Sequence, residues 1–295
     1  MSERPTPAQA KVLKAIQRQL ADMQRMVDRA EESRDHTGAW PSAAWSDDLD
    51  DRARRHHELA RAAAAAGVPQ AWIDQVRTRG EYKLPWRVDL HWREPDSPDR
   101  ATLLDRFHRQ VQQVQDMAAV AAAHAERGAR AEPGTASLFD RRFRLLAQRL
   151  GAMAALLKIS SSEAEQLWGE HTFAAAADSV RDATPDQLAR RWHDHVRADT
   201  AHLALQAHAL SDAGISAGLA RRPPPTAEDM VHRVHDLLAT ADLPAPSPGG
   251  REIAAAADAV GITADAPDTP TPPTPAPHPE PTTTQTGTPA ADLEP

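Results

Sequence analysis

Apolar residues recur every three or four positions along most of this chain, which is the spacing that places them on one face of an α-helix. The most regular run covers residues 97–125, where apolar steps of three and four alternate throughout. Its apolar positions are Leu104, Phe107, Val111, Val114, Ala118, Ala121 and Ala125. This heptad seam predicts packing on another helix, either of the same chain or of a second copy in a homodimer.

Capping and turn residues delimit the other helical stretches. We expect Ser46 to cap a helix that stops at Gly67, Pro69 to open a short second helix, and Ser97 with Pro98 to open the heptad helix. Three further helix starts have a reciprocal capping pattern: Ser160 with Glu163, Thr184 with Gln187, and Thr226 with Asp229. The remaining expected helices cover residues 8–33, 138–157, 161–168, 185–210, 227–238 and 252–260.

One stretch alternates with a period of two instead, as a strand does. Its apolar residues are Tyr82, Leu84, Trp86, Val88, Leu90 and Trp92. Pro85 argues against a central strand, and no second strand is predicted. We therefore expect an extended arm that lays its aromatic face on helices or pairs across a dimer.

These patterns predict an all-α fold, a helical bundle with long antiparallel helices, one extended Trp-bearing arm and a disordered C-terminal tail. Residues 267–295 contain ten prolines and eight threonines but one leucine, too little apolar surface to offset the entropy of ordering. The expected division is an N-terminal amphipathic helix (1–35), a helical pair with the arm (46–93), a bundle (97–220), C-terminal helices (226–262) and the tail (263–295).

Composition narrows the function classes. Cysteine is absent, which excludes disulfides, thiolate metal sites and cysteine nucleophiles. No run of about 18 uncharged apolar residues is present, so no membrane span is expected. The start of the chain lacks the apolar run of a secretory signal, so we expect a cytoplasmic location by elimination.

Motifs that would indicate an enzyme or a metal site have simpler explanations. Residues 214–218 spell G-x-S-x-G, but Ser216 follows a predicted helix rather than a strand, so we interpret it as a loop residue. His195, Asp199 and His202 share one face of the predicted long helix, where a solvated polar face is the preferred interpretation. Phosphate-binding and zinc-protease motifs are absent. We therefore expect a binding protein, not an enzyme, with no cofactor.

Charge is distributed unevenly. The net charge is −8, yet residues 52–93 hold nine Lys and Arg against four Asp and Glu, a local surplus of +5. An acidic balance therefore does not exclude a polyanionic partner on one face.

Residues 59–77, LARAAAAAGVPQAWIDQVR, resemble the helix-turn-helix family of DNA-binding segments. Small alanines allow close helix crossing, Gly67 suits a left-handed turn, and Val68, Ile73 and Val76 anchor the second helix. The resemblance implies that the second helix enters a major groove, with His56 near phosphates. The implied DNA-binding residues are Gln70, Asp74, Gln75, Arg77 and Arg79, with Ala71 on the same face.

A second match to the same pattern covers residues 150–168, with Lys158 where Gly is preferred. Two consecutive core helices joined by a capped turn are the preferred interpretation there.

The chain as a whole resembles uncharacterised helical proteins of actinobacterial genomes and mobile elements, a resemblance that brings no known activity. It is carried by Gly67-Val68-Pro69 with Trp72-Ile73, by Trp86 and Trp92, and by residues 117–121, MAAVA. Two hypotheses follow. The first is a DNA-associated accessory or regulatory protein that uses residues 67–77. The second is a non-enzymatic helical scaffold that binds a partner chain through its long helices.

Overall fold

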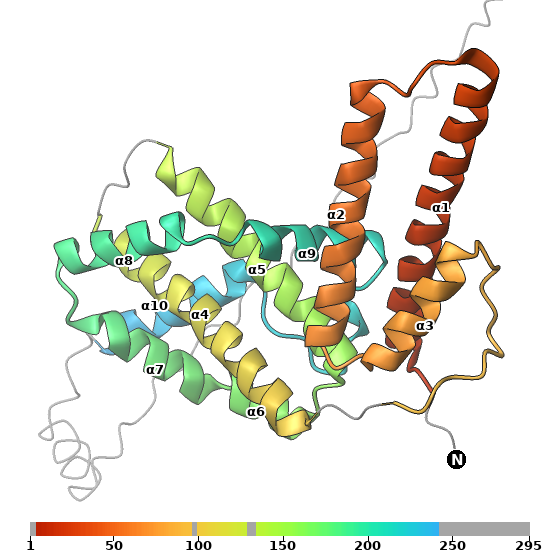
Figure 1. Ribbon diagram of the computed structural model, residues 1–295. Coiled ribbons are helices and arrows are strands. Elements are labelled where there is room, and N and C mark those ends of the chain that lie inside the picture. The colour runs from red at the N-terminus through yellow and green to blue at the C-terminus, as the bar shows by residue number, and fades with distance from the viewer. Residues whose placement is uncertain (1–3, 96–98, 129–133, 242–295) are drawn as a thin grey trace, which may run out of the picture. The chain divides into compact units, whose positions relative to one another are not determined.

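The periodic stretches of the sequence fold into helices, and no strand is present in the residues that the structure describes. A computed structural model describes residues 4–95, 99–128 and 134–241 (Figure 1). The elements are α1 (Pro7–Thr37), α2 (Ala43–Ala65), α3 (Gln70–Glu81), α4 (Arg100–Glu126), α5 (Thr135–Leu157), α6 (Ser161–Trp168), α7 (Glu170–Arg181), α8 (Pro185–Arg197), α9 (Ala201–Asp212), the 3₁₀ turn η1 (Ala217–Leu219) and α10 (Ala227–Ala241). The all-α prediction is confirmed.

The three predicted reciprocal caps are all present. Each cap oxygen accepts from the backbone N–H three residues on, and the side chain at that position accepts from the backbone N–H of the cap residue. The cap of α2 was predicted wrongly. Ser42, not Ser46, begins the helix by accepting a hydrogen bond from the Trp45 backbone N–H at 3.3 Å. Asp99 caps α4, and the predicted cap at Ser97 lies outside the described residues.

α4 is the central helix of the bundle and packs on α5, α7, α8 and α10. Phe107, Val111 and Val114 are buried as the heptad predicts. Further along, the helix is buried almost all round from residue 117 to residue 124, whereas Ala125 is exposed. A straight helix drifts relative to a seven-residue repeat, so the late heptad positions rotate out of the seam. Helices of the same chain therefore occupy the seam that we considered for a homodimer.

The predicted long helix from residue 185 to residue 210 is divided into α8 and α9. In the break between them, the Asp199 side chain accepts a hydrogen bond from the Ala201 backbone N–H, a local side-chain bond that competes with a continuous helix. His195 and His202 therefore lie on different helices, and His195 Nε2 is 2.8 Å from Asp116 Oδ2. Across the described residues no group of three His, Asp or Glu is placed to hold a metal ion.

The predicted arm is neither a strand nor uniformly buried. Trp92 is buried and Trp86 half-buried, but Tyr82, Leu84 and Val88 are exposed. Lys83 takes a left-handed conformation (φ 54°) and the chain turns again near Val88, so side chains do not keep the two-residue alternation of an extended segment.

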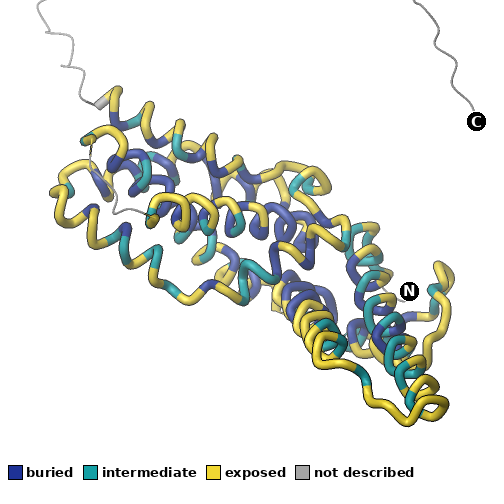
Figure 2. Tube along the Cα trace, turned by 90° about the horizontal axis from the view of Figure 1, so that it is seen from above, coloured by how far each residue is buried: buried dark blue, intermediate teal, exposed yellow. Residues whose placement is uncertain are grey.

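α1 and α2 form an antiparallel hairpin whose far half extends beyond the neighbouring helices (Figure 1). Between Met23 and His56 no residue is buried, as the yellow and teal tip in Figure 2 shows. The near half packs on α3, α5 and α9. The described residues belong to one compact unit that ends at Leu243, and the helix expected at 252–260 and the tail lie outside them. None of the described helices is long and apolar enough to cross a membrane.

Candidate functional site

The turn between α2 and α3 has the predicted conformation. Gly67 is left-handed with φ 76°, and the Val68 N–H reaches back to the Ala63 carbonyl at 3.0 Å. A Cβ atom added at Gly67 would lie 2.9 Å from Leu103 Cδ1, so the turn is pressed against the start of α4. Residues 59–77 therefore form a tight helical pair, as the sequence predicts.

Three of the five residues predicted to bind DNA lie on an exposed stripe of α3. Gln70, Asp74 and Arg77 are all exposed. The Gln70 side-chain amide donates to Asp74 Oδ1 at 2.8 Å, so these two polar groups satisfy each other. The stripe has one cation and one carboxylate among these residues, and its charge alone does not favour a polyanion.

The other two residues are bound to the arm. Gln75 donates to the His91 carbonyl at 2.8 Å and accepts from the Arg93 backbone N–H at 3.1 Å. The Arg79 guanidinium donates to the Pro85 carbonyl at 2.8 Å. Base or phosphate contact by either side chain would require these hydrogen bonds to break.

The arm is also anchored by aromatic packing. Trp72 is buried on α3, and its Nε1–H donates to the Arg93 carbonyl at 2.8 Å. The Trp72 and Trp92 ring centroids are 5.5 Å apart, and those of Trp86 and Trp92 are 6.1 Å apart. α1 packs on one side of α3 and the arm on another, which leaves the stripe of Gln70, Asp74 and Arg77 exposed.

His56 lies inside the protein and cannot contact phosphate, contrary to the expectation from the resemblance. Its side chain is 6% exposed, and neither ring nitrogen has a hydrogen-bond partner. Burial, followed by the nearby charge of Arg77 and then by His57, lowers the pKa of His56 from 6.5 to about 4. The residue is therefore neutral at physiological pH.

The basic surplus of residues 52–93 is partly neutralised within the protein. Arg52, Arg54 and Arg61 pair with carboxylates of α2, and Lys83 lies 2.5 Å from Asp28 on α1. Because these ion pairs neutralise much of the positive charge, residues 52–93 offer fewer free cations to a polyanion than the sequence indicates.

A buried polar network that the sequence analysis missed joins α2 to the bundle. The Gln206 amide donates to Glu58 Oε2 at 2.7 Å and accepts from Arg149 Nε at 2.7 Å, while Arg149 Nη1 donates to Gln110 at 2.6 Å. Burial lowers the pKa of Arg149 to about 10, although Glu58 opposes the shift. Nothing in the periodicity marks these residues, since their partners are distant in sequence. The network fixes the base of the hairpin.

The tip of the hairpin offers a different kind of surface. Trp40 is 77% exposed, the Arg34 guanidinium lies 4.9 Å from its ring centroid, and Trp45 is half-buried beside it. A surface hollow of about 640 Å³ lies here, lined among others by Met26, Ala30, Trp40 and Trp45. Helical periodicity in the sequence does not mark these two tryptophans, because both lie between the helices predicted at residues 8–33 and from Ser46 onward. Comparison with family models, curated proteins and solved structures yields no match for this chain.

Proposed function

We propose that this chain is a non-enzymatic interaction protein that binds a partner protein through the tip of the α1–α2 hairpin. The observation that carries the proposal is Trp40, a large aromatic side chain held 77% exposed at the end of a projecting hairpin. Exposed tryptophans of this kind are costly to hydrate and are enriched among the residues that dominate protein–protein binding energy.

The far half of the hairpin supports the same proposal. No residue between Met23 and His56 is buried, so this half gains little from burial against the rest of the chain. Its fixed base, held by the Glu58 network, presents the tip in one place. A rigid base with an under-packed tip favours recognition of a partner that completes the packing.

Site-specific crosslinking tests the proposal. A photo-crosslinking amino acid at Ala39, which lines the tip hollow, should form a protein adduct in cells that express the chain naturally. The matched control is Ala136, an exposed alanine on α5. The partner identified by the adduct is then purified and titrated, and Trp40→Ala should weaken its binding about thirtyfold, the value expected for a hot-spot residue worth about 2 kcal/mol.

A matched substitution separates the tip from general hydrophobicity. Leu138→Ala removes another exposed apolar side chain, 56% exposed on α5, and should leave the affinity unchanged. Equal adducts at Ala39 and Ala136, or equal affinities for wild type and Trp40→Ala, would refute the proposal.

DNA association through α3 is the second candidate, and one observation favours it. Gln70, Asp74 and Arg77 are exposed along one stripe after a tight glycine turn. It ranks second because Gln75 and Arg79 are engaged by the arm and the turn is docked on α4.

Duplex binding separates the two candidates. If α3 binds DNA, affinity for a fluorescein-labelled duplex should fall steeply with salt, and Arg77→Gln should lower it about fivefold, while Arg25→Gln on α1 should not. Fluorescence anisotropy measures both. Salt-dependent duplex binding that Arg77→Gln weakens, together with no adduct at Ala39, would favour DNA association over partner binding at the hairpin tip.

A further inference from the structure

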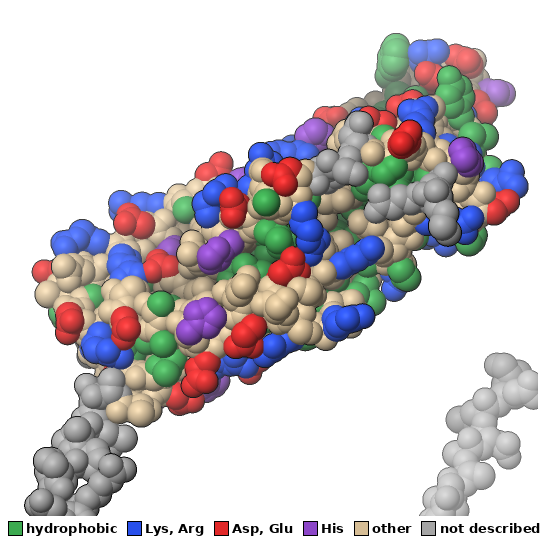
Figure 3. All heavy atoms as spheres, turned by 90° about the horizontal axis from the view of Figure 1, so that it is seen from below, with side chains coloured by type: hydrophobic (Ala, Val, Ile, Leu, Met, Phe, Trp, Pro, Cys, Tyr) green, Lys and Arg blue, Asp and Glu red, His purple; other side chains and the backbone are tan. Residues whose placement is uncertain are grey.

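A second surface, away from the hairpin tip, has the features of a binding site for an anionic ligand. It lies where α1 begins, where α5 passes into α6, and beside η1, three places far apart in sequence. A hollow of about 590 Å³ occupies this junction, which we call the basic hollow. Figure 3 views the chain from the side on which the N-terminus and α6 lie in Figure 1, and there Lys and Arg side chains lie close to hydrophobic ones.

Three cations surround the basic hollow without partners. Lys11, Lys158 and Arg221 line it and are exposed, and no hydrogen bond or ion pair joins any of them to another described residue. No Asp or Glu among the described residues lines the hollow. Three like charges around one hollow repel one another, and an anion placed between them would relieve that repulsion.

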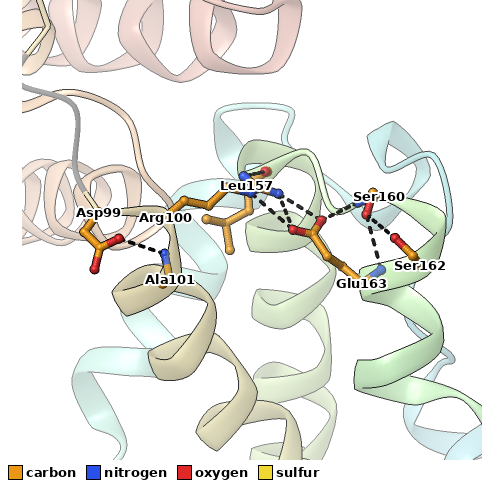
Figure 4. A network of polar contacts seen from close by, with 7 residues as sticks. All are labelled: Asp99, Arg100, Ala101, Leu157, Ser160, Ser162 and Glu163. Carbon is orange, nitrogen blue, oxygen red and sulfur yellow. Dashed lines mark hydrogen bonds and ion pairs between the residues drawn. The ribbon is translucent and has the colours of Figure 1, made fainter.

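Two carboxylates of α6, which begins beside the hollow, are already engaged elsewhere. Glu163 accepts from Arg100 at 2.9 Å and from the Ser160 backbone N–H at 2.7 Å, and Figure 4 shows its carboxylate turned toward these groups. Glu165 pairs with Arg222 at 2.8 Å. The ion pairs leave the positive charge of the basic hollow uncompensated within the described chain.

The other residues that line the basic hollow offer apolar contacts rather than free hydrogen-bonding groups. Ala8, Ile159 and Leu219 contribute apolar surface. The Thr6 and Ser160 hydroxyls that border the hollow accept from backbone N–H groups of their own helices as caps. A nucleotide-sized ligand is usually held by several buried polar groups, and this open hollow supplies charge and apolar surface instead.

The backbone conformation of Lys158 is also unusual. It ends α5 in a left-handed conformation with φ 52°, a position where glycine is favoured and a lysine costs conformational energy. Its side chain is exposed and unpaired, so no interaction within the described chain offsets that cost.

We propose that the basic hollow binds an acidic segment of a partner polypeptide, with carboxylates near Lys11, Lys158 and Arg221 and apolar side chains against Ala8, Ile159 and Leu219. The basic hollow and the hairpin tip share no lining residue, so each can fail its test without affecting the other.

The test is fluorescence anisotropy with the full chain and a short labelled peptide of alternating Glu and Leu. The peptide should bind with an affinity that falls as salt rises, and the matching Gln and Leu peptide should not bind. Lys158→Gly should weaken binding about fivefold, and the combined Lys11→Gln, Lys158→Gly and Arg221→Gln variant should abolish it.

Lys83→Gly is the matched control, since Lys83 is the other described non-glycine residue with positive φ and it pairs with Asp28 outside the basic hollow. It should leave the peptide affinity unchanged. Equal weakening by Lys83→Gly, or no binding of the acidic peptide, would overturn the proposal. Preferential binding of duplex DNA that Lys158→Gly weakens would overturn it in favour of a nucleic-acid ligand.

Discussion

Two helix pairs in this chain share one sequence pattern, and their turns differ in a single important residue. α2 and α3 are joined at Gly67 (φ 76°), and α5 and α6 at Lys158 (φ 52°). The backbone is closed in the same way in both, because the residue after each turn residue donates five residues back: Val68 to Ala63 at 3.0 Å and Ile159 to Ala154 at 3.2 Å. The pattern therefore fixes the turn geometry and leaves the identity of the turn residue to the surroundings.

The surroundings explain why one turn has glycine and the other lysine. A Cβ atom at Gly67 would be 2.9 Å from Leu103 and 3.6 Å from Leu157, the last residue of α5. The two turns are therefore in contact. The position that a side chain would take at Gly67 is occupied by neighbouring residues, whereas the side chain of Lys158 faces solvent. The first turn is constrained by packing and the second is free to present a charge.

The largest expected effect on stability comes from adding a side chain at Gly67, in the turn between α2 and α3. Gly67→Val should destabilise the protein by about 4 kcal/mol, because a branched residue is strained at positive φ and also collides with Leu103. Gly38→Val is the control, since Gly38 has φ 71° but no atom within 4 Å of the added Cβ. Urea unfolding should show a smaller loss for Gly38→Val, which keeps the backbone strain but adds no collision, and equal losses would mean that packing at Gly67 has no role.

Buried ionisable groups on the first helices of the two pairs give the next test. Arg149 on α5 is satisfied by two glutamines, whereas His56 on α2 has no partner. Because the pKa of His56 is about 4 in the fold and 6.5 when unfolded, the unfolded state binds the proton first as pH falls. Stability should be complete above pH 6.5 and decline by roughly 3 kcal/mol toward pH 4.

Urea unfolding at a series of pH values measures this loss. His56→Leu should remove this part of the pH dependence, and His57→Leu, at the exposed neighbour, should retain it. A wild-type pH profile that His56→Leu leaves unchanged would show that His56 is not the group responsible.

The sequence predicts the fold well where the information is local. Caps, glycine turns and the burial of Val111 follow from residues within one or two helical turns of each other. The prediction fails where a local choice competes with a regular pattern. The periodic stretch of residues 185–210 is interrupted where the Asp199 side chain accepts a local hydrogen bond from the Ala201 backbone N–H, and the left-handed Lys83 breaks an alternation that predicts an extended segment.

The candidate sites depend on contacts that no sequence window contains. The engagement of Gln75 by the arm joins residues 16 and 18 positions apart, and Gln206 meets Glu58 across 148 positions. The basic hollow assembles Lys11, Lys158 and Arg221 from three parts of the chain. Spacing along the chain therefore indicated a helical pair correctly, but it could not show which of its side chains are already bound.

The second helices of the two pairs can be compared through their tryptophans. Trp72 on α3 donates its Nε1–H to Arg93, whereas Trp168 on α6 has a buried Nε1 with no partner. Trp72→Phe should cost about 1 kcal/mol more than Trp168→Phe, the value of the one hydrogen bond that differs. Thermal or urea unfolding measures the difference. A greater loss at Trp168 would indicate that ring packing, not the arm contact, dominates.

The smallest expected effect is a gain in stability rather than a loss. Lys158→Gly should stabilise the protein by about 0.5–1 kcal/mol, because glycine adopts the left-handed turn without strain and no described contact of the lysine is lost. Lys83→Gly relieves the same backbone strain but breaks the pair with Asp28, so its gain should be smaller. Urea unfolding of both variants checks the order. If Lys158→Gly destabilises the protein, the lysine side chain contributes to the stability of the fold. Weaker peptide binding by this variant would then not show that the charge of Lys158 binds the peptide.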